Sequence, residues 1–134
     1  MKVEIKSQEY KIFDISDDLT IYTKNLNEEI ACSFFSSKLS KIALARNISI
    51  EQLEKLIAEL TENKSIERNL VKVQVIGGDD SPESYKYFTD IVNALDRIDN
   101  NTDMINLIGS DTCKNIHPNS FEINGYHGGV RALD

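Results

Sequence analysis

The sequence predicts one domain over residues 1–134, of the α/β class in its mixed α+β form, with a mixed β-sheet, a βαβ unit and two main helices. β-branched residues alternate with Lys and Gln over Val71–Ile76, and a second apolar run covers Met104–Ile108, so both are typical of strands. Helical spacing of apolar residues over Pro82–Asp99 joins them into a βαβ unit, whose strands are expected to be parallel. A second amphipathic segment, Ile50–Glu62, predicts the other helix.

The first third of the chain is rich in short strand candidates. Lys2–Ile5 and Tyr10–Ile15 are separated by four polar residues, a spacing that predicts a hairpin. Leu19–Thr23 is predicted to form the next strand, and the compact apolar run Ile30–Phe35 is predicted to form a buried strand. Leu39–Ala45 suits either a strand or a short helix.

Both helices have recognisable starts. Ser49 is expected to cap the first helix, with Gln52 at the capping-box position. Either Asp80 or Ser81 is expected to cap the second helix, with Pro82 in its first turn. The expected core residues of the two helices are Leu53, Leu56, Ile57, Leu60, Phe88, Val92 and Leu95, and Tyr85 lies on the same stripe.

Two pairs of consecutive glycines lie between predicted elements. Gly77-Gly78-Asp79-Asp80 lies between a strand and a helix, but it lacks the spacing of a phosphate-binding loop, and its aspartates would repel a phosphate. Gly128-Gly129 lies between the candidate strands Phe121–Ile123 and Val130–Leu133, which are expected to form a C-terminal hairpin. The sequence therefore predicts tight turns at both pairs and no nucleotide cofactor.

The composition is that of a soluble, acidic protein. The net charge is −7 and the sequence pI is about 4.8, which argues against binding to nucleic acid or to an anionic membrane. No apolar run approaches the roughly 20 residues of a membrane span, and charges within the first six residues argue against a signal peptide. We therefore expect a cytoplasmic protein, for which an acidic surface would suit a basic protein partner.

Thiol and imidazole side chains, which could act as nucleophile, base or zinc ligand, are few. Cys32, Cys113, His117 and His127 are the only Cys and His residues. Four such ligands could complete a structural zinc site only if all of them converged, and their spacing is unlike that of a zinc knuckle, so we expect no bound metal. Cys32, between apolar neighbours, is either a buried structural cysteine or a thiolate nucleophile that needs a nearby histidine.

The order of these segments resembles the chemoreceptor glutamine deamidase family, CheD. In that family a strand leads to a nucleophilic cysteine in a Gly-Ser-Cys motif, and the segments that follow are a strand ending at a histidine, a helix, a strand ending in Gly-Gly, a long helix, a strand and a C-terminal hairpin. The resemblance covers roughly residues 19–133 and implies a CheD-like layered sandwich with Cys32 at the nucleophile position. Ile30-Ala31 replaces the Gly-Ser here, and no histidine precedes His117. A base would therefore come from His117 or His127.

Two functions from different classes remain open. The resemblance implies a cysteine-dependent deamidase that acts on a protein glutamine, with Cys32 as nucleophile and His127 or His117 as base. The alternative is a catalytically silent acidic binding protein, such as an immunity or inhibitor protein, that blocks a basic partner.

Overall fold

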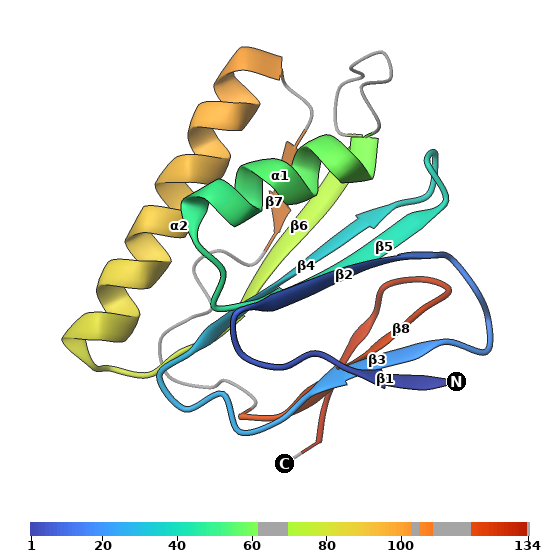
Figure 1. Ribbon diagram of the computed structural model, residues 1–134, viewed down its shortest axis with the longest axis horizontal. Coiled ribbons are helices and arrows are strands. Elements are labelled where there is room, and N and C mark those ends of the chain that lie inside the picture. The colour runs from blue at the N-terminus through green and yellow to red at the C-terminus, as the bar shows by residue number, and fades with distance from the viewer. Residues whose placement is uncertain (62–69, 103–104, 109–118, 134) are drawn as a thin grey trace.

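Two β-sheets and a pair of helices form three layers, with the five-stranded sheet in the middle (Figure 1). The computed structural model describes residues 1–61, 70–102, 105–108 and 119–133. Within these residues the four-stranded sheet has the order β1 (Lys2–Glu4), β3 (Thr20–Thr23), β8 (Phe121–Asn124), β9 (Val130–Ala132). The five-stranded sheet has the order β2 (Glu9–Asp14), β5 (Lys41–Arg46), β4 (Ile30–Ser36), β6 (Val71–Gly77), β7 (Ile105–Ile108). The helices α1 (Ile50–Thr61) and α2 (Pro82–Thr102) cover one face of the five-stranded sheet.

The expected βαβ unit is confirmed. β6 and β7 are adjacent and parallel, with Val73 opposite Leu107, and α2 is the crossover between them. The other pairs of the five-stranded sheet are antiparallel, so the sheet is mixed, as the sequence predicts. The segment 39–45, which suited either a strand or a helix, forms β5 between β2 and β4.

The expected N-terminal hairpin is wrong. β1 pairs in parallel with β3 of the four-stranded sheet, whereas β2 pairs antiparallel with β5 of the other sheet. The connection between them crosses from one sheet to the other because Ile5 is fully buried in the core that the two sheets share. The Ile5 amide donates to the Tyr22 carbonyl, and the Ile5 carbonyl accepts from the Thr23 hydroxyl. These two hydrogen bonds hold the connection to β3. The C-terminal hairpin of β8 and β9, by contrast, is confirmed.

The helix starts agree with the sequence. Ser49 and Gln52 form the reciprocal capping box, with side chain to amide distances of 3.0 and 3.1 Å. At α2 the cap is Ser81, whose hydroxyl accepts from the Ser84 amide at 3.2 Å, and Asp79 in turn accepts from the Ser81 amide.

The buried face of α2 is rotated relative to the expected stripe. Leu95 is buried as expected, but Phe88 and Val92 are only half-buried and Tyr85 is 65% exposed. Ser84 and Tyr87 face inward because their hydroxyls have partners there: Ser84 accepts from the Asp79 amide, and Tyr87 donates to the Ile48 carbonyl at 2.6 Å. The spacing of apolar residues alone therefore predicts a buried face of α2 that is rotated about the helix axis from the observed one. In α1 all four expected residues are buried.

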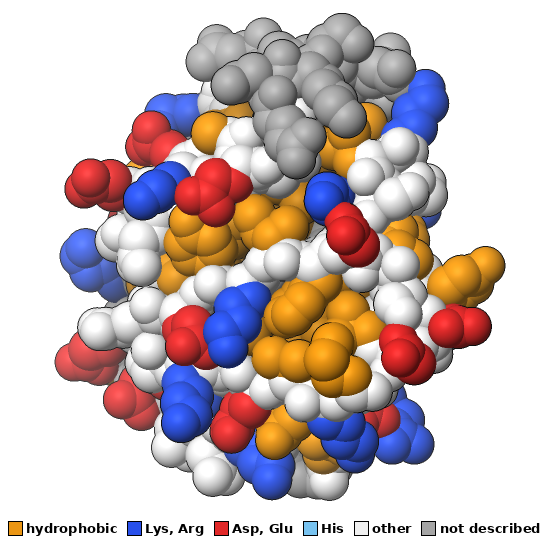
Figure 2. Space-filling model, turned by 45° about the vertical axis from the view of Figure 1, so that its right-hand side comes forward, with side chains coloured by type: hydrophobic (Ala, Val, Ile, Leu, Met, Phe, Trp, Pro, Cys, Tyr) orange, Lys and Arg blue, Asp and Glu red, His pale blue; other side chains and the backbone are white. Residues whose placement is uncertain are grey.

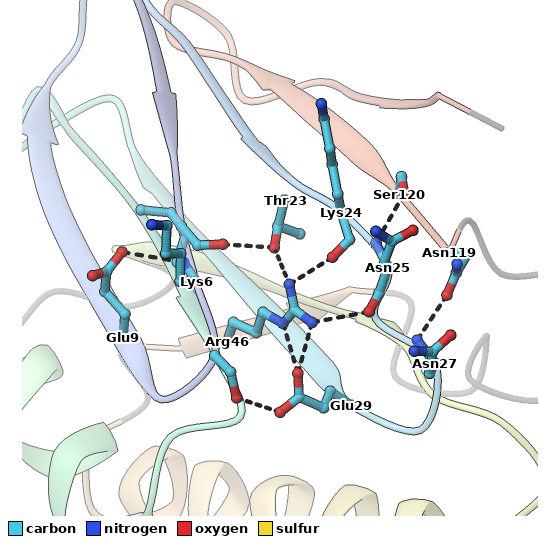
Figure 3. Close-up of polar contacts among 12 residues, drawn as sticks. Lys6, Glu9, Thr23, Lys24, Asn25, Asn27, Glu29, Arg46, Asn119 and Ser120 are labelled. Carbon is cyan, nitrogen blue, oxygen red and sulfur yellow. Dashed lines mark hydrogen bonds and ion pairs between the residues drawn. The ribbon is translucent and has the colours of Figure 1, made fainter.

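A buried arginine connects the two sheets (Figure 3). Arg46, at the end of β5, forms an ion pair with Glu29 at 2.7 Å and donates to the Thr23 hydroxyl at 3.0 Å. It also donates to the carbonyl groups of Lys24 at 2.7 Å and Asn25 at 3.0 Å. The segment 24–29, which leads from β3 in one sheet to β4 in the other, is thus held by one guanidinium with its donors in a fixed fork.

The two residues that precede β8 also hold this segment. Asn25 and Asn27 have φ angles of +55°, a left-handed conformation that Asn tolerates better than most residues. Their amides donate to the side chains of Ser120 and Asn119, at 3.0 and 2.7 Å. This sheet-to-sheet crossing is therefore closely fixed, which makes it a structural rather than a mobile element.

Candidate functional site

Cys32 lies in the core between the five-stranded sheet and the helices. Alternation along β4 points Ile30, Cys32 and Phe34 toward α1 and α2, and the Cys32 side chain is only 2% exposed. An apolar enclosure disfavours the thiolate, which is the nucleophilic form of cysteine. Burial also raises the pKa of the adjacent Tyr87 far above its ordinary value, and Cys32 and Glu29 raise it further, so Tyr87 stays a neutral donor.

His127 lies on the opposite side of this sheet. It is exposed in the turn between β8 and β9, where Asn124 accepts from the amides of Tyr126 and His127. The turn packs on Phe35, which alternates away from the helices: a Cβ added at Gly128 would lie 3.0 Å from the Phe35 ring. The structure therefore does not bring Cys32 and His127 together. Cys113 and His117 lie outside the described residues, so a role for His117 as base stays a prediction.

A hollow of about 200 Å³ lies between the His127 turn and the face of β4 and β6. It is lined by Ser33, Phe35, Lys72, Gln74 and the backbone of Gly128 and Gly129 as well as by His127. No sequence pattern marks Ser33, Lys72 or Gln74 as functional residues. The period-2 alternation of the two strands places them away from the helices, but only the strand register shows that they are neighbours.

The helical layer carries most of the net negative charge of the protein. Helices α1 and α2 with the turn 79–81 hold nine acidic and three basic residues, a net −6 of the chain's −7. Eight of the nine are exposed, and Asp99 is half-buried. Residues 1–48, which form β1–β5, hold seven residues of each sign and are neutral. Figure 2, in which the right-hand side of Figure 1 comes forward, shows acidic and basic side chains interspersed around apolar patches.

The acidic residues exceed what the helices need for their own stability. Glu51 and Glu83 stand in first turns, where a negative charge stabilises the helix dipole. Asp79 and Asp80 precede α2, also at the end where a negative charge is favourable. The other five acidic residues lie further along the helices, and neither helix has a basic residue in its last turn. A hollow of about 250 Å³ between the helices has an apolar floor of Ala94 and Ile98, beside Glu54 and Arg97. We name the outer surface of α1, α2 and the turn 79–81 the acidic face.

Two further features bear on the class of site. In the described parts of the chain, no three Cys, His, Asp or Glu side chains are grouped so that they could hold a metal ion. None of the described helices is long and apolar enough to cross a membrane.

Fold and site together define a three-layered α+β protein with an enclosed cysteine, a polar hollow on its strand side and an acidic helical face. No known family model matches the chain. The uncharacterized protein RC0132 of Rickettsia conorii is 71% identical to it over 69 residues, which are 52% of this chain and 92% of that protein. The chain therefore belongs to the same family as this bacterial protein.

Proposed function

We propose that the protein is a catalytically silent acidic binding protein that docks its acidic face on a basic partner protein, as an immunity or inhibitor protein does. The observation that carries the proposal is the segregation of charge, because nearly all of the net charge lies on one layer while β1–β5 are neutral. Like charges gathered on one face add up to a potential that steers a basic partner and raises the rate of association. The hollow between α1 and α2 would accept an apolar side chain at the centre of such a contact.

The enclosure of Cys32 supports this proposal over the deamidase that the CheD resemblance implies. A deamidase would need the sulfur to reach a glutamine carboxamide and a base within hydrogen-bond distance. Cys32 is 2% exposed and the sheet separates it from His127. The chemistry would require the helices to move away from β4.

Thiol reactivity separates the two functions. In a Cys113→Ser background, Cys32 is the only thiol, and its alkylation by iodoacetamide at neutral pH reports its accessibility. A binding protein with a structural Cys32 reacts only as fast as it opens, so mild urea accelerates the reaction strongly. Fast alkylation of the native protein, at the rate of an accessible thiolate, would contradict the proposal and favour the deamidase.

Charge neutralisation tests the acidic face directly. The triple variant Glu51→Gln, Glu54→Gln, Glu59→Gln removes three charges from α1, and association with an immobilised lysine-rich peptide measures the effect. The matched control, Glu4→Gln, Asp17→Asn, Glu28→Gln, removes the same charge from the strand side. We expect the helix variant to weaken binding by about tenfold and to reduce its salt dependence, because screening acts on these same charges. Equal losses in both variants would show that net charge alone, and not this face, binds the peptide.

A further inference from the structure

The hollow beside His127 has a polar floor that the strand register assembles. In the antiparallel pair of β4 and β6, Ser33 lies opposite Gln74 and Phe35 opposite Lys72. Residues opposite each other or two apart share one face of the sheet, so these four side chains form a compact group of neighbours. The preceding pair on this face, Ala31 and Ile76, is covered by the core shared with the four-stranded sheet. The hollow therefore begins where that core ends.

Within the part of the chain that the structure describes, the fold does not use the polar side-chain groups of this floor. Ser33 is a buried residue, with an exposed fraction of 7%. Across the described ranges, the Ser33 hydroxyl, the Gln74 carboxamide and the Lys72 ammonium have neither a hydrogen bond nor an ion pair to another residue. A buried hydroxyl without a partner costs stability unless water or a bound group satisfies it. Since Ser33 lines the hollow, a bound group there would satisfy it.

The β8–β9 turn gives His127 a defined role. The Nδ1 atom of His127 accepts a hydrogen bond from the Gly129 amide at 3.0 Å. Neutral histidine carries one proton, so an accepting Nδ1 places that proton on Nε2. In this tautomer Nε2 donates and cannot take a proton from Ser33. In this tautomer His127 therefore offers a donor to a ligand in the hollow and not a base for a serine nucleophile, which needs an accepting Nε2.

From this arrangement we infer that the hollow is a binding site for a small organic carboxylate. Lys72 supplies one positive charge, and the Ser33 hydroxyl, the Gln74 amide and His127 Nε2–H supply neutral donors. A carboxylate carries a single charge and accepts several such hydrogen bonds. The Phe35 ring forms an apolar wall for the remainder of the molecule, and about 200 Å³ suits a ligand of benzoate size. The site is separate from the acidic face, because the five-stranded sheet lies between them.

Benzoate is a suitable probe, and amide chemical shifts in a ¹H–¹⁵N spectrum of the full chain report where it binds. We expect saturable shifts centred on Gly128, Gly129 and the β4–β6 pair at Ser33, with a Kd of about 1 mM or below. Benzamide has the same shape without the charge and is expected not to saturate the site. No saturation by benzoate, or equal binding of benzamide, would overturn the inference. Tighter binding of inorganic phosphate would overturn the assignment of the ligand as a carboxylate.

Variants connect the binding to named side chains. Lys72→Gln is expected to weaken benzoate binding by about tenfold or more, because a charge-assisted hydrogen bond is lost. Lys2→Gln on β1 is the matched control, since it removes the same charge from an exposed strand residue outside the hollow. Ser33→Ala removes only the hydroxyl, so the fold should persist while binding falls several-fold. Unchanged affinity in both Lys72→Gln and Ser33→Ala would overturn the site.

Discussion

Replacing Arg46 by Met tests how strongly one buried arginine holds the two sheets together. The change keeps an unbranched side chain of similar length but removes the ion pair with Glu29 and the donors to the Thr23 hydroxyl and to two carbonyl groups. Removing one partner of a fully buried ion pair costs about 3–5 kcal/mol, mostly because the other charge is left uncompensated. Here the two side chains are 11% and 20% exposed, and Glu29 also accepts from the Ser7 hydroxyl. We therefore expect the lower end of that range, about 3 kcal/mol.

Urea unfolding measures the loss. A decrease of about 3 kcal/mol is a large part of the 5–15 kcal/mol that holds a typical domain, so the midpoint should fall clearly while the slope stays the same. Lys86→Met is the control: its pair with Asp90 is exposed on α2, and about 0.5 kcal/mol is expected. A double-mutant cycle with Glu29→Gln should give a coupling above about 1 kcal/mol. If Arg46→Met costs no more than the control, the network contributes nothing to stability and the reasoning is refuted.

Two further predictions concern α2. Leu95→Ala should cost about 2–5 kcal/mol because Leu95 is 1% exposed, whereas Phe88→Ala should cost only about 2 kcal/mol because half-buried Phe88 leaves a smaller cavity; urea midpoints in the reverse order would contradict the rotated face. The raised pKa of Tyr87 means that the folded protein keeps its phenolic proton where the unfolded chain loses it. Its contribution to stability is therefore complete below about pH 10 and declines at higher pH, and Tyr87→Phe should unfold with a flatter dependence on alkaline pH. An unchanged dependence in urea melts up to about pH 11 would contradict the burial of this hydroxyl.

The sequence by itself determined the elements whose signals are local. The capping box at Ser49, the apolar stripe of α1 and the parallel pair of β6 and β7 all follow from short-range patterns and from the handedness of a βαβ crossover. In each case the residues that carry the signal lie within one element or in elements joined by one crossover. The local preferences and the final fold agree there.

Only the tertiary structure decided how strands far apart in the chain are paired. Period-2 alternation shows that Cys32 and Ser33 point to opposite faces, but not that the helices cover Cys32 and the His127 turn lies over Ser33. Because strand pairing is not visible in a local pattern, the N-terminal strands were predicted to form a hairpin. In the structure the chain passes from one sheet to the other at the buried Ile5. For the same reason the sequence does not show that Ser84 and Tyr87 face the core. Their hydroxyls turn inward because groups from other segments donate to Ser84 and accept from Tyr87. Such pairings are set by burial and hydrogen bonding between distant segments, which no local pattern contains.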